Sequence, residues 1–139
     1  MDPSDYDAWK EVARADRAFY RCFERLDIAA MEALWLRDDR VRCIHPGGEV
    51  LLGYEQVMAS WRAILGGNAS LRFELVDPSI EVVGDLAWAS HVERISSGDE
   101  EPEHASVSEA AATNVYQLRD GEWKMVVHHA SPIARRFFS

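Results

Sequence analysis

The groups of this sequence best suited to moving protons are histidines, and the first of them stands at a marked position. His45 ends a predicted strand, 41–45, after the apolar residues Cys43 and Ile44, and the turn Pro46-Gly47-Gly48 follows it directly. Pro46 favours an extended backbone at His45, and the glycines permit a tight reversal. An imidazole, whose usual pKa is about 6.5, accepts a proton near neutral pH. We therefore predict that His45 faces a pocket and acts as its general base.

Alternation along two later segments predicts polar partners for His45. In the segment 123–129, one set of alternate residues is apolar except at its end: Trp123, Met125, Val127 and His129. This set is predicted to face the interior and to carry His129 with it, which leaves His128 on the outer side. Asn114 shares a face with Tyr116. We expect His129 to return the proton and Asn114 to donate a hydrogen bond to a developing enolate oxygen.

Other residues are predicted to hold a ligand. Tyr54 and Trp61 would supply an apolar wall for a ring or acyl chain, and Tyr20 offers a hydroxyl group. The strand 86–95 is ambiguous because its two faces differ. One face carries small residues together with His91 and Glu93, and these two join the ligand site only if that face lines the pocket. Otherwise they meet a partner subunit or solvent.

Structural roles explain several of these residues equally well. His45 would cap its strand by bonding a backbone carbonyl, and His129 would be a satisfied interior histidine. Asn114 would tie down a neighbouring loop, and Trp61 would belong to the core. His91 and Glu93 would form a cross-strand ion pair.

No metal or cofactor is predicted. His128 and His129 are adjacent and point to opposite faces of a strand, and the sequence has no HxxxH or HExxH pair. A site built from His45, His129 and Glu93 is geometrically conceivable. The sequence contains no GxSxG motif, P-loop or dinucleotide-binding fingerprint, so serine hydrolysis and nucleotide binding have no support.

The elements that position these residues follow from hydrophobic periodicity, which changes halfway along the chain. Three- and four-residue spacing predicts a first helix that carries Trp9 to Phe23, then the helices 28–35 and 53–65. Alternation then predicts the strands 71–76, 80–83, 86–95, 105–118 and 123–129, with a break at Pro78 and a hairpin turn at Asp120-Gly121. This order predicts an α+β fold: a curved mixed or antiparallel sheet around a pocket closed by three helices.

Composition limits the class of protein. The 139 residues are expected to form one domain, 1–139, with 47% hydrophobic residues available for a core. The net charge of −9 argues against nucleic acid or an anionic membrane as a partner. No apolar run approaches the roughly 20 residues that span a bilayer. The acidic N-terminus is unlike a signal peptide, and Cys22 and Cys43 lack metal or redox spacing, so we predict a cytoplasmic protein with reduced thiols.

Several segments, in this order, resemble one protein family. They are Phe19-Tyr20 to Trp35, Cys43-Ile44-His45-Pro46-Gly47 to Trp61, Gly84-Asp85-Leu86-Ala87-Trp88, and Thr113-Asn114-Val115-Tyr116 to Pro132. The chain resembles the SnoaL-like branch of the nuclear transport factor 2-like superfamily, which includes the ketosteroid isomerases. The resemblance implies a cone-shaped α+β barrel with a deep pocket and a homodimer packed through the outer face of the sheet. It implies no single activity, because isomerisation, dehydration, cyclisation, hydrolysis and plain ligand binding all occur on this fold.

The isomerase site carries over only in part. The isomerase base is an Asp directly before a Pro, and His45 holds that place here. The Tyr that donates to the oxyanion falls near Phe19, with Tyr20 beside it, and the protonated Asp corresponds to Asn114. Steroid isomerase activity is therefore not expected.

Two functions of different class remain open. One is a cofactor-independent isomerase or dehydratase that acts alpha to a carbonyl in a small hydrophobic molecule, with His45 as the general base. The other is a non-catalytic ligand-binding or dimeric association module. The segment Ile133-Ala134-Arg135-Arg136-Phe137-Phe138 would either dock on a partner subunit or cover the pocket.

Overall fold

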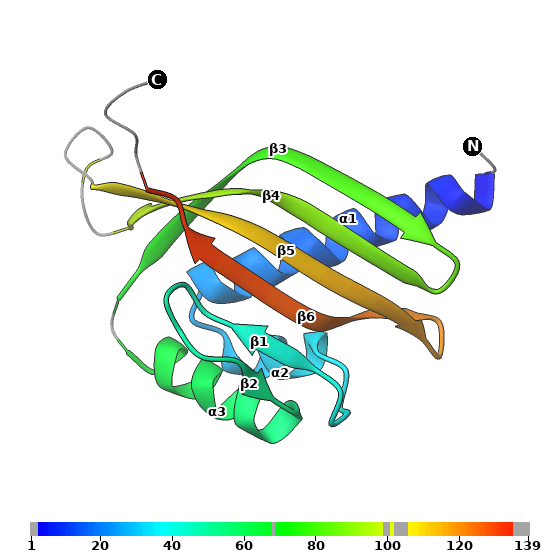
Figure 1. Ribbon diagram of the computed structural model, residues 1–139, viewed down its shortest axis with the longest axis horizontal. Coiled ribbons are helices and arrows are strands. Elements are labelled where there is room, and N and C mark those ends of the chain that lie inside the picture. The colour runs from blue at the N-terminus through cyan, green and yellow to red at the C-terminus, as the bar shows by residue number, and fades with distance from the viewer. Residues whose placement is uncertain (1–2, 68, 99–100, 102–105, 135–139) are drawn as a thin grey trace.

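The computed structural model describes residues 3–67, 69–98, 101 and 106–134, so most of the C-terminal segment predicted to dock or to cover the pocket lies outside it. Helices and strands follow the predicted order (Figure 1). The described helices are α1 (Pro3–Glu24), α2 (Ile28–Leu34) and α3 (Tyr54–Leu65). The described strands are β1 (Arg42–Ile44), β2 (Leu51–Leu52), β3 (Leu71–Val83), β4 (Leu86–Ser97), β5 (Val107–Arg119) and β6 (Glu122–Pro132). The short β2 has no counterpart in the sequence prediction.

Helix α1 forms because its apolar residues recur on one side of the helix. Val12, Ala13, Phe19 and Tyr20 are buried on that side, while Glu11 and Arg14 are exposed. Asp27, a residue type that favours the start of a helix, stands directly before α2, and its side chain accepts a hydrogen bond from the Ala30 backbone N–H at 3.0 Å. In this way α1 presents one continuous buried stripe to the sheet.

The strands form one mixed sheet in the order β2-β1-β6-β5-β4-β3. All pairings between the described strands are antiparallel except that of β1 with β6, which is parallel and sets Ile44 opposite His129. Helix α1 crosses one face of the sheet, and no described helix covers the other face (Figure 1). The sheet does not close, because β2 and β3 are its two edges. This arrangement confirms the predicted α+β fold.

The predicted break at Pro78 is wrong, because β3 runs through it. The pairing with β4 shifts register between Val76 and Ser79, and Asp77 between them takes a positive φ of 53°. Two residues thus leave the ladder as a bulge while the strand continues. Proline lacks a backbone N–H and is tolerated at this place because β3 is an edge strand.

A second bulge reverses the prediction for the end of β6. Val115 pairs with Val127, whereas the next residue, Tyr116, pairs with Met125, so Val126 is an extra residue in β6. Up to Met125 the predicted face is buried, and after the bulge the alternation is inverted. His128 and Ala130 are therefore buried and His129 is exposed. The expectation that His129 faces the interior and His128 the exterior is wrong, because it assumed an unbroken period of two.

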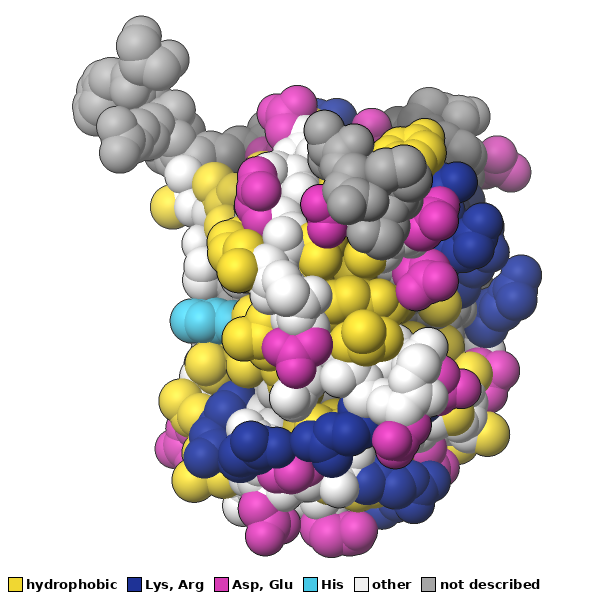
Figure 2. Space-filling view, turned by 90° about the vertical axis from the view of Figure 1, so that its right-hand side faces the viewer, with side chains coloured by type: hydrophobic (Ala, Val, Ile, Leu, Met, Phe, Trp, Pro, Cys, Tyr) yellow, Lys and Arg dark blue, Asp and Glu magenta, His cyan; other side chains and the backbone are white. Residues whose placement is uncertain are grey.

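Charge is mixed on one face of the molecule. At the end of the molecule where α1 begins, acidic and basic side chains are interspersed around hydrophobic ones (Figure 2). Cys22 and Cys43 are both free and buried. Within the part of the chain that the structure describes, no helix is long and apolar enough to cross a membrane.

Candidate functional site

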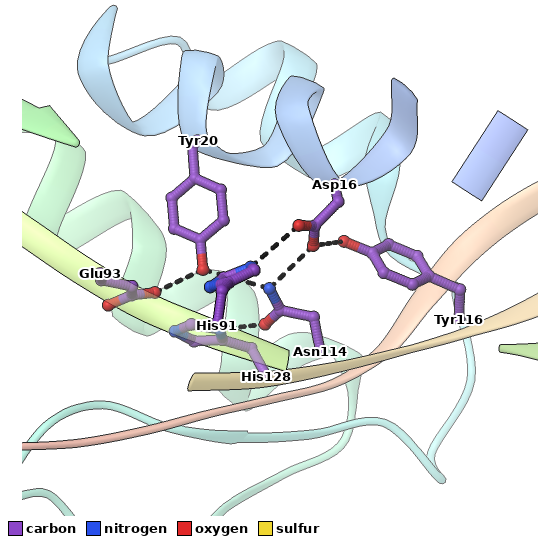
Figure 3. Close-up of polar contacts among 7 residues, drawn as sticks. All are labelled: Asp16, Tyr20, His91, Glu93, Asn114, Tyr116 and His128. Carbon is purple, nitrogen blue, oxygen red and sulfur yellow. Dashed lines mark hydrogen bonds and ion pairs between the residues drawn. The ribbon is translucent and has the colours of Figure 1, made fainter. Parts of the chain in front are cut away.

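A group of buried polar side chains lies between α1 and the face of the sheet that it covers (Figure 3). Each of them has 6% or less of its surface exposed. We call this group the interior network; its members are Asp16 and Tyr20 from α1, His91 and Glu93 from β4, Asn114 and Tyr116 from β5, and His128 from β6. Buried polar groups on this scale require mutual hydrogen bonds, and the network supplies them.

Asp16 is the centre of the interior network. Its Oδ1 accepts hydrogen bonds from the Asn114 amide at 2.9 Å and from the Tyr116 hydroxyl at 2.6 Å. Its Oδ2 accepts one from His91 Nε2 at 2.9 Å. Burial by itself raises the pKa of the carboxyl group, but the hydrogen bonds from His91, Tyr116 and Asn114 and the charge of His91 outweigh it, so the pKa of Asp16 is lowered. Asp16 is therefore an ionised carboxylate in the protein interior.

Asp16 holds one ring nitrogen of His91, and the other ring nitrogen has no hydrogen-bond partner among the described residues. Because the carboxylate only accepts, His91 Nε2 carries the hydrogen of this bond. The other nitrogen, Nδ1, is fully buried and has no hydrogen-bond partner among the described residues. In the neutral form of the ring, Nδ1 carries a lone pair that accepts no hydrogen bond, which is uncommon for a buried polar atom.

Tyr20 and Glu93 form the second branch of the interior network. The Tyr20 hydroxyl donates to Glu93 Oε2 at 2.5 Å and accepts from the Asn114 amide at 3.2 Å. Burial raises the pKa of Glu93, although the hydrogen bond from Tyr20 acts against it. Burial, with the nearby charge of Glu93, also raises the pKa of Tyr20. Both shifts favour keeping the protons on this pair.

Asn114 joins the branches to His128. Both amide hydrogens of Asn114 are engaged, one by Asp16 and one by Tyr20. Its Oδ1 is 2.6 Å from His128 Nδ1, which must be the donor because an amide oxygen only accepts. Burial, which is the main cause, lowers the pKa of His128 to about 3, so the ring is neutral at physiological pH.

His45 lies at the margin of the interior network. Its ring is half-buried, with the His128 ring centroid 6.3 Å away and the Trp61 ring 4.7 Å away. The Ser60 hydroxyl is 3.0 Å from His45 Nε2 and already donates to the Val57 carbonyl at 2.6 Å, so Nε2 is the donor. Burial lowers the pKa of His45, and its Nδ1 keeps a lone pair.

The structure shows which face of the strand 86–95 points inward, a question that the sequence left open. The small-residue face of β4 points inward, with Ala87, Ala89, His91 and Glu93 all buried. Tyr20 and Asn114 also lie in the interior network, and their predicted roles toward a ligand stay predictions. In Asn114, however, both amide hydrogens are already engaged, so the residue positions its neighbours in this structure.

Three predicted site residues lie elsewhere. The Tyr54 hydroxyl donates to the Glu32 carbonyl at 2.9 Å, and the Tyr54 ring lies under Arg37, away from the interior network. Trp61 is fully buried and packs edge-on against Phe19 and His45. His129 lies on the outer face and lines a shallow groove of about 270 Å³ that runs across β4, β5 and β6.

Sequence reasoning missed Asp16, Tyr116 and His128. Asp16 had a signal, because it stands four residues after Val12 and three before Phe19 and therefore lies within the apolar stripe of α1. An acidic residue at such a position must find buried donors. Tyr116 shared the inward face with Asn114, but its hydroxyl was not assigned a role. His128 was hidden by the bulge at Val126.

The described residues include no group of three or more His, Cys, Asp or Glu side chains arranged to hold a metal ion. The donors of the interior network are used for hydrogen bonds to one another. The network contains groups suited to proton transfer: an ionised carboxylate, a histidine with one ring nitrogen that has no hydrogen-bond partner, and a phenol paired with a buried carboxyl group.

Comparison with known proteins agrees with this architecture. The family model of the SnoaL-like domain matches residues 12–135, which include every member of the interior network. The chain belongs to the SnoaL-like domain family. The family model covers nearly all of this SnoaL-like domain and leaves out only short segments at the two ends. The resemblance stated from the sequence is therefore confirmed.

Solved structures of similar proteins carry two kinds of description. A proposed dehydratase of the nuclear transport factor 2-like family from Streptomyces avermitilis is 32% identical, with a TM-score of 0.84 over 93% of this chain and 98% of that one. A proposed calcium/calmodulin-dependent protein kinase type II association domain from Thiobacillus denitrificans is 37% identical, with a TM-score of 0.74 over 86% and 93%. The association domain of the C. elegans kinase, 18% identical with a TM-score of 0.76 over 94% and 99%, shares the fold.

One curated relative is a longer protein. The F-box protein SKIP8 of Arabidopsis thaliana is 30% identical over 130 residues, which cover 88% of this SnoaL-like domain and 53% of SKIP8. The chain thus spans about half the length of this relative.

Proposed function

We propose that this SnoaL-like domain is a cofactor-independent acid–base enzyme, an isomerase or dehydratase acting alpha to a carbonyl group of a small hydrophobic molecule. The observation that carries the proposal is the buried Asp16–His91 pair with its unpartnered Nδ1. A carboxylate that fixes an imidazole and leaves its second nitrogen open is the arrangement of a general base.

In this proposal His91 removes the proton at Nδ1 while Asp16 stabilises the imidazolium through Nε2. Asp16 remains ionised during the step, because three donors hold its charge. The geometry supports His91 as the base better than the sequence prediction of His45. The reason is that no described carboxylate contacts the His45 ring, whose neighbours are Ser60, Trp61 and Cys43.

Tyr20 is the group that would meet the developing enolate oxygen. Its hydroxyl hydrogen points to Glu93 in the resting protein. When Glu93 is protonated, a state that its raised pKa favours, Glu93 donates to Tyr20 and the phenol hydrogen is released toward the substrate oxygen. Asn114 then positions both branches, since its amide holds Asp16 and Tyr20 together.

The test is enzyme-dependent exchange of alpha protons, which reports proton abstraction without the natural substrate. Cyclohexanone, 2-indanone and 2-tetralone are incubated with the protein in D₂O, and loss of the alpha-proton signals is followed by ¹H NMR. We expect exchange above the buffer rate for at least one ketone. We expect His91→Gln to lower that rate by about 10²-fold or more, the usual contribution of a general base.

Two variants with the same substitution serve as controls. His129→Gln changes a histidine on the outer face and is expected to retain exchange. His45→Gln tests the alternative base: loss of exchange in His45→Gln alone would assign the proton transfer to His45 and overturn the role of His91. Absence of exchange with every ketone, in a wild-type protein shown to be folded by circular dichroism, contradicts the enzyme proposal.

We also propose a second function, association of identical chains through the outer face of the sheet. The observation that favours it is the exposure of large apolar side chains on β4, where Leu86 is 45% and Trp88 is 40% exposed on a face that no described helix covers. The similarity to the association domain from Thiobacillus denitrificans supports it. The homodimer and the catalytic site are compatible, since they use opposite faces of β4.

A further inference from the structure

An apolar groove outside the interior network leads from the surface to Asp16. Its walls are Trp9 and Ala13 from α1 and Leu75, Pro78 and Ile80 from β3, and Asp16 lies among its lining residues. The groove opens between the first half of α1 and the edge strand of the sheet. Hydrophobic side chains gather at the corresponding end of the molecule, with charged side chains around them (Figure 2).

The bulge in β3 shapes this groove. Asp77 and Pro78 leave the β-ladder between Val76 and Ser79, so β3 changes course beside α1 at this point. Pro78, a member of the bulge, lines the groove and has no N–H that needs a partner. Leu75 before the bulge and Ile80 after it both line the groove. The bulge residue Pro78 thus forms part of the groove wall between Leu75 and Ile80.

Asp16 gives the groove a charged acceptor in apolar surroundings. A carboxylate offers about four lone-pair sites, and three are used by His91, Asn114 and Tyr116. Oδ2 accepts from His91 alone among the described residues, so one further donor fits there. Arg17, an exposed residue, also lines the groove, and its positive charge disfavours a cationic occupant. The complementary donor is therefore a neutral hydroxyl group.

Size narrows the occupant further. The groove holds about 220 Å³, which is below the roughly 300–1,000 Å³ of sites for drug-sized ligands. A molecule with one or two rings matches this volume, and the flat wall of Trp9 suits a ring.

We propose that the groove between α1 and β3 binds a neutral one- or two-ring alcohol or phenol, with its ring against Trp9 and Ile80 and its hydroxyl group donating to Asp16. The assignment of this molecule as the substrate rests on the proposed function, since Asp16 also holds His91. In a ring compound with a hydroxyl group beta to its carbonyl, His91 Nδ1 would take up the alpha proton and then return it to the hydroxyl oxygen, which leaves as water, while Asp16 stays ionised.

The test compares two probes that differ in one hydrogen-bond donor. Binding of 2-naphthol and of 2-methoxynaphthalene is measured by NMR titration of the Ile80 and Ala13 methyl signals. The dissociation constant of 2-naphthol is expected to be at least tenfold lower, because only the hydroxyl group donates to a carboxylate. Equal affinity of the two probes overturns the role of Asp16.

A pair of tryptophan variants tests the location. Ile80→Trp fills the groove and is expected to lower the affinity for 2-naphthol at least tenfold. Glu81→Trp adds the same bulk at the next, exposed position of β3 and is expected to leave it unchanged. Unchanged binding in Ile80→Trp overturns the proposal. Circular dichroism of both variants separates loss of binding from loss of folding. If Ile80→Trp does not fold, Ile80→Val, which removes one methyl group from the groove wall, is used instead and is expected to lower the affinity for 2-naphthol by a smaller factor.

The same variants separate the two proposals. If Ile80→Trp blocks 2-naphthol binding while the wild type exchanges no alpha protons of any ketone, the groove is supported and the proposed catalysis fails. If alpha-proton exchange occurs and persists in Ile80→Trp, the catalysis is supported and the groove is not its entrance.

Discussion

Removal of the Tyr116 hydroxyl group tests whether Asp16 is an ionised carboxylate held by buried donors. Tyr116 is fully buried, and its hydroxyl donates to Asp16 Oδ1 at 2.6 Å. Tyr116→Phe deletes this one bond and keeps the ring. A hydrogen bond to a charged group contributes about 1.5–3 kcal/mol, so we expect the free energy of unfolding to fall by about that amount. For a domain of this size the loss corresponds to a decrease in Tm of roughly 5–10 °C.

Tyr54→Phe is the matched control. The Tyr54 hydroxyl donates at 2.9 Å to a neutral acceptor, the Glu32 carbonyl, so its removal should cost only about 0.5–1.5 kcal/mol. Both variants are compared with the wild type by urea denaturation at pH 7. A loss in Tyr116→Phe no larger than that in Tyr54→Phe would refute the account of Asp16 as a charged, buried acceptor.

Tyr116→Phe is also expected to change how the free energy of unfolding depends on pH. The pKa of Asp16 is lowered in the folded protein, so its contribution to stability is present above the unfolded pKa of about 3.8 and is lost as pH falls through the folded pKa. Tyr116 is one of the groups that lower the pKa, so Tyr116→Phe raises it. On acidification, the variant should therefore lose the stabilising contribution of Asp16 at a higher pH than the wild type does. The free energy of unfolding, measured between pH 5 and pH 2, checks this expectation.

Three further predictions concern the histidines and the outer face. His128→Ala should lower the free energy of unfolding by about 2–4 kcal/mol, because it empties a buried position and leaves Asn114 Oδ1 unpaired. His129→Ala, at an exposed position, should change the free energy of unfolding by less than about 0.5 kcal/mol. Equal effects of the two substitutions in urea denaturation would contradict the position of the β6 bulge at Val126. His128 has its folded pKa lowered from 6.5 to about 3, so the unfolded chain takes up the proton first and stability falls as pH drops from about 6.5 toward 3. We expect this residue alone to reduce the free energy of unfolding by about 3 kcal/mol at pH 4.5, because pH 4.5 lies two units below the unfolded pKa. An NMR titration in which the His128 ring protonates between pH 6 and 7 would contradict this expectation. Trp88→Glu should convert the protein to monomers in analytical ultracentrifugation if chains associate through the outer face, and a wild type that is monomeric at 100 µM would exclude that association.

Periodicity predicted the fold well because most elements follow it without interruption. The stripe of α1 and the alternation of β4 and β5 each extend over many residues, and the Asp27 cap is a local signal. The prediction failed where one or two residues were inserted in a ladder. Pro78 was taken as the end of a strand, although an edge strand accommodates it as a bulge.

The site was predicted only in part for the same reason. Asn114 lies on a strand with a regular alternation, and its inward face could be derived. His91 and Glu93 share one face of β4, but the sequence left open whether that face points inward. Val126 shifts the phase of β6 by one residue, and no feature of the sequence 123–129 marks this bulge. The exchange of His128 for His129 therefore required the pairing with β5, which is a tertiary property.

Asp16 shows the opposite case, in which the signal was present but was given no weight. A carboxylate on the buried side of an amphipathic helix is costly unless donors surround it. His91 and Tyr116 lie on other elements, so the sequence alone does not reveal that they converge on Asp16. Buried acids within apolar stripes thus indicate a polar site even before their partners are known.

The most direct test of the central claim is a ¹⁵N NMR measurement of the His91 ring nitrogens, with and without 2-tetralone. We expect a protonated Nε2, bound to Asp16, and an unprotonated Nδ1 whose signal moves when the ketone is added. The exposed His129 ring is the internal control and should not respond. A hydrogen on Nδ1 and none on Nε2, or a ketone that binds without moving either His91 signal, would contradict the assignment of His91 as the base.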